Sequence, residues 1–205
     1  MIVLGVGMPL QVRYRCILAL EWSRKLPVKR SSISGFTLIE VLMTMVVLGI
    51  LAALAIPSFS SWVPSYQLKA AAREFYSHCQ LAKLTAIKRN RDCTITFNQL
   101  LGAQLFDYVV YVDSDSDKEY DNGEEVILSR RWMDHGDVAL DRSRGGGDGI
   151  SFLENDEGLP TIAFQPDGLP VNNLGGLGMG TVFLKNQRNL TARAIISSAG
   201  NIRIE

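Results

Sequence analysis

The sequence predicts an α+β protein in which one long N-terminal helix packs on antiparallel β-sheets. Three features support this fold class. An apolar segment runs from Phe36 to Ile56, with Glu40 as its single ionisable side chain. Apolar and small residues then recur at helical spacing, and from residue 91 onward short β-type runs alternate with turn residues. The first part of the chain is therefore expected to be helical, and the second part to be rich in strands.

The apolar segment is long enough to cross a membrane. Its 21 residues rise about 31 Å as a helix, and the hydrocarbon core of a bilayer is about 30 Å thick. Lys25, Lys29 and Arg30 precede the segment, and basic residues beside a span favour the cytoplasmic side. We therefore expect a single-pass protein: a cytoplasmic N-terminus, a 36–57 helix in membrane lipid, and a C-terminal domain across the membrane.

Glu40 is the one carboxylate in this span. An unpaired acid at mid-span costs about 2.5–3.5 kcal/mol, and less near the end of the span. Such a residue either has a functional partner or reaches the headgroups from one turn inside the membrane. An ordinary secretory signal has a shorter apolar core with a small-residue cleavage site after it, and this segment does not follow that pattern.

The stretch Gly35-Phe36-Thr37-Leu38-Ile39-Glu40, followed by the apolar run, resembles the type IV prepilin signal. The resemblance implies that a prepilin peptidase cuts between Gly35 and Phe36 and methylates the Phe36 amine. It also gives Glu40 a partner, the cationic Phe36 amine of a neighbouring subunit, because opposite charges attract strongly in a dry helical bundle. Residues 1–35 are then a leader. Since such leaders are short, a start at Val28 is an alternative to Met1.

Residues 58–90 are expected to continue as an amphipathic helix into the head. Pro57 predicts a kink after the span, because proline removes a helical hydrogen bond, and the prepilin resemblance implies a bend at the same place. Farther along, apolar positions spaced alternately by four and three residues line one helix face. These positions are Leu68, Ala72, Phe75, Cys79, Ala82 and Ala86.

The strand-rich part comprises residues 91–205. Pro166-Asp167-Gly168 and Ala199-Gly200-Asn201 are turn signals, since proline presets φ and glycine permits positive φ. Glycine-rich segments at 144–149 and 172–180 predict loops. The expected strands are residues 93–98, 106–112, 126–132, 161–165, 181–185, 192–197 and 201–205.

The order of these elements is similar to that of the GspH/FimT family of type IV pilin-like proteins. The helix ending in residues 84–90, the acidic loop ending in residues 121–125 and the terminal hairpin in residues 194–203 carry the resemblance. It implies a pilin-like fold, no enzymatic activity, a place in the bacterial inner membrane with a periplasmic head, and assembly with other pilin-like subunits. The implied role is that of a minor pseudopilin of type II secretion. The alternative is a FimT-like minor pilin in pilus biogenesis or DNA uptake.

The charge distribution argues against nucleic acid as a general partner. Residues 36–205 carry 15 basic and 20 acidic side chains, a formal net charge of −5. The family resemblance implies DNA binding by some FimT-type members through a Gly-Arg-x-Arg hairpin, of which Gly200-Asn201-Ile202-Arg203 keeps one arginine. Arg193 and Arg203 are therefore the candidates for a small phosphate-contacting patch.

The acidic loop at residues 113–125 has two interpretations. In the first, carboxylates at positions 1, 3, 5, 7, 9 and 12 of a twelve-residue window resemble an EF-hand calcium loop. Lys118 stands where that loop needs glycine, and the flanking segments are strands. In the second, favoured interpretation, the segment is a solvated hairpin loop that turns at Asn122-Gly123 and needs no metal or cofactor. The carboxylates are Asp113, Asp115, Asp117, Glu119, Asp121 and Glu124.

The cysteines and histidines form no catalytic pattern. Cys79 is expected about 15 Å from Cys93, whereas a disulfide needs Cα atoms within about 7 Å, so two buried thiols are favoured over a bridge; Cys16 lies in the leader. His78 and His135 have no neighbouring nucleophile motif, and Walker, CxxC and HExxH motifs are absent from the sequence. A structural protein is expected.

Overall fold

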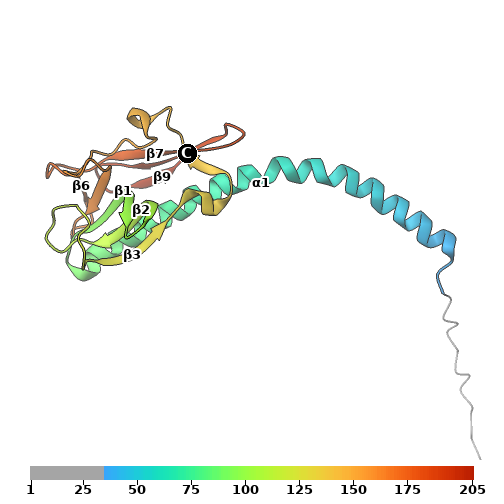
Figure 1. The fold of residues 1–205 in the computed structure, drawn as a ribbon, viewed down its shortest axis with the longest axis horizontal. Coiled ribbons are helices and arrows are strands. Elements are labelled where there is room, and N and C mark those ends of the chain that lie inside the picture. The colour runs from blue at the N-terminus through green and yellow to red at the C-terminus, as the bar shows by residue number, and fades with distance from the viewer. Residues whose placement is uncertain (1–34) are drawn as a thin grey trace, which may run out of the picture. The chain divides into compact units, whose positions relative to one another are not determined.

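The computed structural model describes residues 35–205 (Figure 1). The predicted leader, the alternative start at Val28, Cys16 and the basic residues before the span lie outside the described residues. The described chain divides into two compact units between Met45 and Val46, and each unit is described by itself. The helix α1 (Leu38–Arg89) contributes its first residues to one unit and all the others to the second.

The beginning of α1 is capped by Thr37. The Thr37 hydroxyl accepts a hydrogen bond from the Glu40 backbone amide at 3.2 Å, which satisfies one of the amides left free at a helix start. Glu40 lies in the first helical turn, where the helix dipole favours a negative charge. The helix therefore begins two residues after Phe36, at the first position that a threonine cap permits.

Helical backbone continues through Pro57 and Pro64. Neither proline ends the helix, and the kink expected at Pro57 stays a prediction. Farther along, the predicted apolar face is confirmed, because all six of its residues are at most 3% exposed and Ala71 is buried beside them. Four of these seven residues are alanines, which allow the helix to approach the strands closely.

Within residues 35–205 the strands form two antiparallel sheets. The strand order is β3-β2-β1-β5-β6 in the first sheet and β4-β7-β8-β9 in the second. Figure 1 shows the strands of the second unit lying along α1. The bounds are β1 Cys93–Leu101, β2 Gln104–Val112, β3 Glu125–Arg130, β4 Val138–Leu140, β5 Thr161–Phe164, β6 Pro170–Val171, β7 Gly180–Asn186, β8 Thr191–Ile196 and β9 Ile202–Ile204.

Each predicted strand is present, with shifted ends. The largest correction concerns residues 126–132, because β3 ends at Arg130 and Trp132 begins a 3₁₀ turn, η1 (Trp132–His135). The Trp132 ring packs on Phe75 and Tyr108, with centroid distances of 5.6 and 4.8 Å. Burial of this large ring in the core therefore outweighs its preference for a strand. The short strands β4 and β6 were not predicted, since two or three residues show no periodicity.

A single core joins α1 to both sheets. Phe75 of α1 lies 5.8 Å from the ring of Phe97 and 5.2 Å from that of Tyr108, both in the first sheet. The second sheet contributes Val182 and Leu184 to the same cluster. Because one helix face contacts both sheets, the head depends on α1 for much of its hydrophobic stability.

Two predicted turns meet beside α1. Gly168 and Gly200 have φ values of 80° and 72°, which confirms the positive φ expected of these turn glycines. A Cβ on Gly200 would lie 2.9 Å from the Gly168 carbonyl oxygen, so the close approach requires glycine. Lys83 Nζ donates a hydrogen bond to the Gly200 carbonyl at 3.2 Å, and the helix thereby holds the β8–β9 turn in place.

Candidate assembly helix and head surfaces

The first candidate surface is the apolar part of α1. Leu38–Ala55 is long and apolar enough to cross a membrane, and none of it is buried by the rest of the described chain. Phe36, just before it, is 82% exposed. A contiguous apolar surface of this size is typical of a membrane or subunit interface. The segment therefore requires lipid or neighbouring helices around it.

The predicted processing residues lie at the beginning of this surface. Gly35, Phe36 and Thr37 precede the helix in non-helical, exposed backbone. A Cβ on Gly35 would meet no atom within 4 Å, so nothing in the described chain shields the Gly35–Phe36 bond. Glu40 is also exposed, one turn along the helix. The cleavage and pairing residues expected from the sequence thus occupy one accessible helix end.

The second candidate surface is the acidic loop between β2 and β3. Carboxylate oxygens of Asp113, Asp115 and Asp117 lie within 4.8 Å of one another. Glu124 instead accepts hydrogen bonds from the backbone amides of Ser114 at 2.7 Å and of Asp121 at 3.2 Å. Three of the six predicted carboxylates are therefore brought together, a set of hard oxygen donors of the kind that Ca²⁺ binds, while Glu119, Asp121 and Glu124 stand outside this set.

Lys118 occupies an unusual backbone conformation in this loop. Its φ is 66°, in the left-handed region where EF-hand loops place glycine. Its amide donates to the buried Asp113 carboxylate at 2.9 Å, and its ammonium donates to the Ser116 carbonyl at 2.6 Å. Burial raises the pKa of Asp113 although three hydrogen bonds to the carboxylate oppose the rise. The turn expected at Gly123 is also present, with a φ of 118°.

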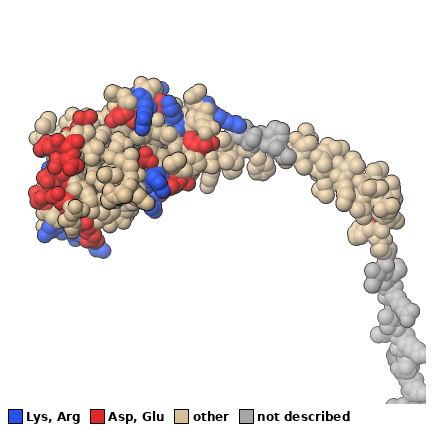
Figure 2. All heavy atoms as spheres, viewed as in Figure 1, with Lys and Arg blue, Asp and Glu red and all other residues tan. Residues whose placement is uncertain are grey.

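The third candidate surface is a basic face on the second sheet. Arg193 and Arg203, the two predicted phosphate contacts, both pair with Glu205, the Arg203 contact measuring 3.0 Å. On the same sheet, Asp141 lies between Arg144 at 3.4 Å and Lys185 at 3.3 Å. Figure 2 shows acidic atoms gathered at one end of the head and basic atoms elsewhere on its surface. The two arginines therefore form a local patch whose charge one carboxylate partly cancels.

A cluster around Glu74 was missed by the sequence analysis. Glu74 on α1 is paired with Arg130 at 3.0 Å and with His135, and His78 Nε2 lies 3.7 Å away. His78 Nδ1 also hydrogen-bonds the Tyr108 hydroxyl at 2.8 Å. The i,i+4 spacing of Glu74 and His78 was a local signal, but no sequence pattern connects Glu74 with residues 56 and 61 positions away. The cluster ties α1 to β3 and η1.

The thiols are structural, as expected. Cys79 and Cys93 are free and buried in the described structure. Burial raises the pKa of Cys93 to about 12, and it raises that of Cys79 further. Both side chains are therefore protonated and unreactive at neutral pH.

Comparison with known proteins decides the family. The family described as "Type II transport protein GspH" matches residues 71–200, from the buried face of α1 to the β8–β9 turn. The chain belongs to the GspH family. A second family, the prokaryotic N-terminal methylation motif, matches residues 30–56, which contain Gly35, Phe36 and Glu40. The GspH assignment and the α+β fold expected from the sequence are thus confirmed, and the motif with its apolar helix indicates a membrane-anchored pilin-like protein.

The chain is also similar to three individual proteins. The "Pilin-like protein PilA1" of Thermus thermophilus is 28% identical over 180 residues, which cover 83% of this chain and 97% of that protein. The minor pilin FimU of Pseudomonas aeruginosa aligns with a TM-score of 0.44 at 13% identity, over 70% of this chain and 92% of FimU. The minor pseudopilin EpsH of Vibrio cholerae gives 0.42 at 13% identity, over 68% and 96%. The GspH family is one of structural pilin-like subunits.

Proposed function

We propose that this GspH-family chain is a structural minor subunit of the type II secretion pseudopilus. A prepilin peptidase removes residues 1–35, Phe36 becomes the methylated N-terminus, and the helix passes from the inner membrane into the filament. The head remains on the periplasmic side. The observation that carries the proposal is the uncovered apolar helix Leu38–Ala55 within the methylation-motif match. The same apolar surface suits both states, because lipid surrounds it before assembly and like helices surround it afterwards.

Glu40 sets the axial position of the helix in this proposal. Its carboxylate pairs with the Phe36 amine of a neighbouring subunit, since an unpaired charge in a dry bundle costs several kcal/mol, about 3–5 when one partner of a buried pair is removed. Glu40 also lies in the first turn of its own helix, where it offsets the positive end of the helix dipole that opposes a cationic amine. Both roles need a negative charge, but only assembly needs the neighbouring amine.

Mass spectrometry of the native protein extracted from membranes tests the maturation step. We expect an N-terminal peptide that begins at Phe36 and carries one added methyl group. A strain that lacks the peptidase should yield the uncut chain and reveal whether it begins at Met1 or at Val28. A mature protein that still contains Gly35 would contradict the proposal.

Glu40→Gln tests the assembly step separately. The variant keeps the size of the side chain and removes its charge, so we expect normal cleavage at Phe36 but loss of the chain from sheared filaments. Thr37→Ser is the matched control, because serine keeps the helix cap one turn away. If Glu40→Gln entered filaments as efficiently as the control, the charge pairing would be wrong while the maturation result would stand.

A type IV minor pilin that contacts DNA is the second candidate. The observation that favours it is that Arg193 and Arg203 lie close enough together to share one carboxylate, Glu205, on an exposed face. Asn201 in place of a second hairpin arginine and the net charge of −5 oppose it. A mobility-shift assay with duplex DNA at low salt, with Arg203→Ala as the comparison, tests this candidate. The neighbouring genes distinguish the two candidates. Genes of a secretion system beside this one favour a pseudopilus, and genes of other minor pilins favour a pilus.

A further inference from the structure

We propose that the head binds an acidic, extended peptide segment of a neighbouring pilin-like subunit in a groove formed by one cavity on the outer face of β7 and β8 and a second cavity between α1 and the strands β8 and β9. The inference deepens the proposed assembly function, and it rests on that function for the source of the peptide. The groove, called the basic groove below, consists of two adjoining cavities on the head. Its shape, its charge and its apolar lining each point to this class of partner.

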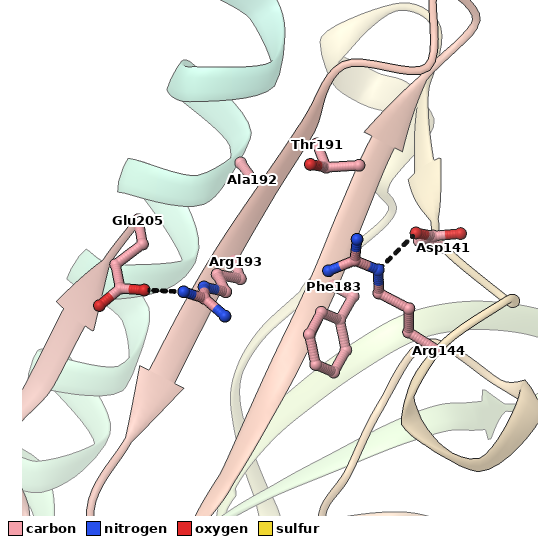
Figure 3. A pocket seen from close by; sticks show the side chains of 7 residues that line it. All are labelled: Asp141, Arg144, Phe183, Thr191, Ala192, Arg193 and Glu205. Carbon is pink, nitrogen blue, oxygen red and sulfur yellow. Dashed lines mark ion pairs between the residues drawn. The ribbon is translucent and has the colours of Figure 1, made fainter.

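The two cavities adjoin each other, because they share lining residues. The first has a volume of about 330 Å³ and lies above Phe183, between Arg144 and Arg193 (Figure 3). The second has a volume of about 650 Å³ and lies between α1 and the strands β8 and β9. Thr191, Ala192 and Glu205 line both cavities. A bound segment that occupies both must pass Glu205 at the end of β9, which suits a peptide in an extended conformation.

The basic groove has a surplus of positive charge. Two carboxylates are each held between two cations, Asp141 by Arg144 and Lys185, and Glu205 by Arg193 and Arg203. On the α1 side, two further cations, Lys69 and Arg73, line the second cavity. Neither forms an ion pair with an acid within residues 35–205. Of the residues that line the two cavities, four cations thus face two acids. Residues 36–205 as a whole are net negative, so this local surplus of positive charge is complementary to an acidic partner.

The sheet holds Arg193 of the first cavity, and Phe183 on the same sheet positions Arg144. Phe183, Arg193 and Glu205 face one another across β7, β8 and the end of β9, because Phe183 pairs with Arg193 and the Arg193 backbone exchanges hydrogen bonds with Glu205 at 2.9 Å. The Arg144 guanidinium lies 5.7 Å from the centre of the Phe183 ring. Planar guanidiniums bind carboxylates with two hydrogen bonds, and prior placement on a rigid sheet lowers the entropy cost of binding.

The lining distinguishes a peptide from a nucleic acid. Leu68, Leu190 and Ile204 line the second cavity, where they offer contacts to apolar side chains. Asp141 and Glu205 lie in the floor of the first cavity and repel a continuous phosphate backbone, whereas a peptide can place isolated acids beside the arginines. The observations therefore favour a segment that alternates acidic and apolar residues, since alternate side chains of an extended peptide point to opposite sides.

The test uses the full chain in a neutral detergent and a fluorescent, end-blocked peptide Glu-Leu-Glu-Leu-Glu. We expect saturable binding that weakens as salt rises, because the charges are partly exposed. The double variant Arg144→Gln/Arg193→Gln should weaken binding at least tenfold, and a Gln-Leu-Gln-Leu-Gln peptide should bind no better than this variant. Arg188→Gln is the matched control: it makes the same charge change in the β7–β8 turn, outside both cavities, and should bind as the native chain does.

Three results would overturn the inference: no binding of the acidic peptide, equal binding by the double variant, or equal loss in Arg188→Gln. Binding of a twelve-base-pair DNA duplex in place of the peptide would also overturn it and would favour the nucleic-acid candidate. Thermal unfolding of each variant checks that the fold is retained. If the peptide does not bind but the chain is cleaved normally at Phe36, the groove proposal is wrong and the proposed function stands. If the native protein is uncut but binds the peptide, the proposed function is wrong and the groove proposal stands.

Discussion

The two parts of α1 make opposite use of their apolar side chains. Between Leu38 and Ala55 the side chains are mostly large, and the described chain buries none of this segment. Between Leu68 and Ala86 the apolar face is dominated by alanine and is buried completely against the sheets. The second part therefore finds its apolar surroundings within its own chain. The first part must find them in lipid or in other subunits, and this difference is what makes the protein a candidate for assembly.

Phe75→Ala and Leu48→Ala test this comparison directly. Phe75 is fully buried among three aromatic rings, so its truncation should lower the free energy of unfolding of the head by about 3–5 kcal/mol. Leu48 is 64% exposed, and its truncation should change that free energy by less than about 0.5 kcal/mol. Urea unfolding of the full chain in detergent, followed by near-UV circular dichroism, measures both. Similar losses in the two variants would show that the parts of α1 are not energetically distinct.

Glu74→Gln tests the ion pairs that connect the buried part of α1 to β3 and η1. The Glu74 carboxylate holds Arg130 and His135 against α1, and a neutral amide leaves both with a weaker partner. We expect a loss of about 1.5–3 kcal/mol at pH 7.5, the usual range for hydrogen bonds to charged groups. Arg91→Gln is the control, since Arg91 has only a 3.4 Å contact with a backbone carbonyl. A loss in Glu74→Gln no larger than in the control would mean that the core alone holds α1 on β3 and η1.

The pH dependence of stability separates the contributions of His78 and Glu74. Burial lowers the pKa of His78 below 6.5, so the folded head favours the neutral ring, and stability should fall as pH drops from about 6.5 towards the lowered pKa. Burial raises the pKa of Glu74, but Arg130 and His135 lower it more, so its contribution is full above about 4.5 and is lost below that value. Unfolding measured from pH 7.5 to 3.5 should show both stages. Glu74→Gln should reduce the lower stage and keep the upper one. The lower stage should not vanish, because Glu125 and Asp141 also have lowered pKa values, and a lower stage of unchanged size would show that Glu74 does not contribute to it.

The fold was predictable where the signal is local along the chain. The face from Leu68 to Ala86 follows from helical spacing, and the methylation motif in residues 30–56 is contiguous in the sequence, so both could be recognised without coordinates. Cleavage between Gly35 and Phe36 stays a prediction. Trp132 was misplaced because strand preference is local whereas its burial depends on Phe75, 57 positions earlier. The basic groove was out of reach for the same reason. The groove exists only because α1 lies beside β8 and β9. The sequence predicts the helix and the strands, but it does not predict that they are in contact.

The acidic loop is a third kind of segment, because hydrogen bonds within the loop keep it ordered. Changes in this loop should have the smallest effect on stability. Lys118 has a positive φ, which costs an L-residue about 1–2 kcal/mol, while glycine adds about 0.4–1 kcal/mol of unfolded-state entropy. Lys118→Gly should therefore stabilise the head by about 0.5 kcal/mol. The Lys118 ammonium donates a hydrogen bond to the Ser116 carbonyl, in the loop that carries the three gathered carboxylates, and its positive charge opposes the binding of a cation there. We therefore expect about 1 mM Ca²⁺ to raise the unfolding temperature of Lys118→Gly but not of the native chain.

Lys118→Ala separates the two effects of that change. Alanine removes the ammonium but keeps a side chain at positive φ, so it should gain the response to Ca²⁺ without the intrinsic stabilisation. Calorimetric titration of the three proteins, with Mg²⁺ as the comparison ion, measures binding directly. Heat and stabilisation from Ca²⁺ in the native chain would show that Lys118 does not block the site, and the EF-hand-like interpretation of the loop would then be the right one. No response in either variant would mean that hydrogen bonds from the loop's own backbone already satisfy the carboxylates, and that the loop needs neither a metal nor a second subunit to keep its shape.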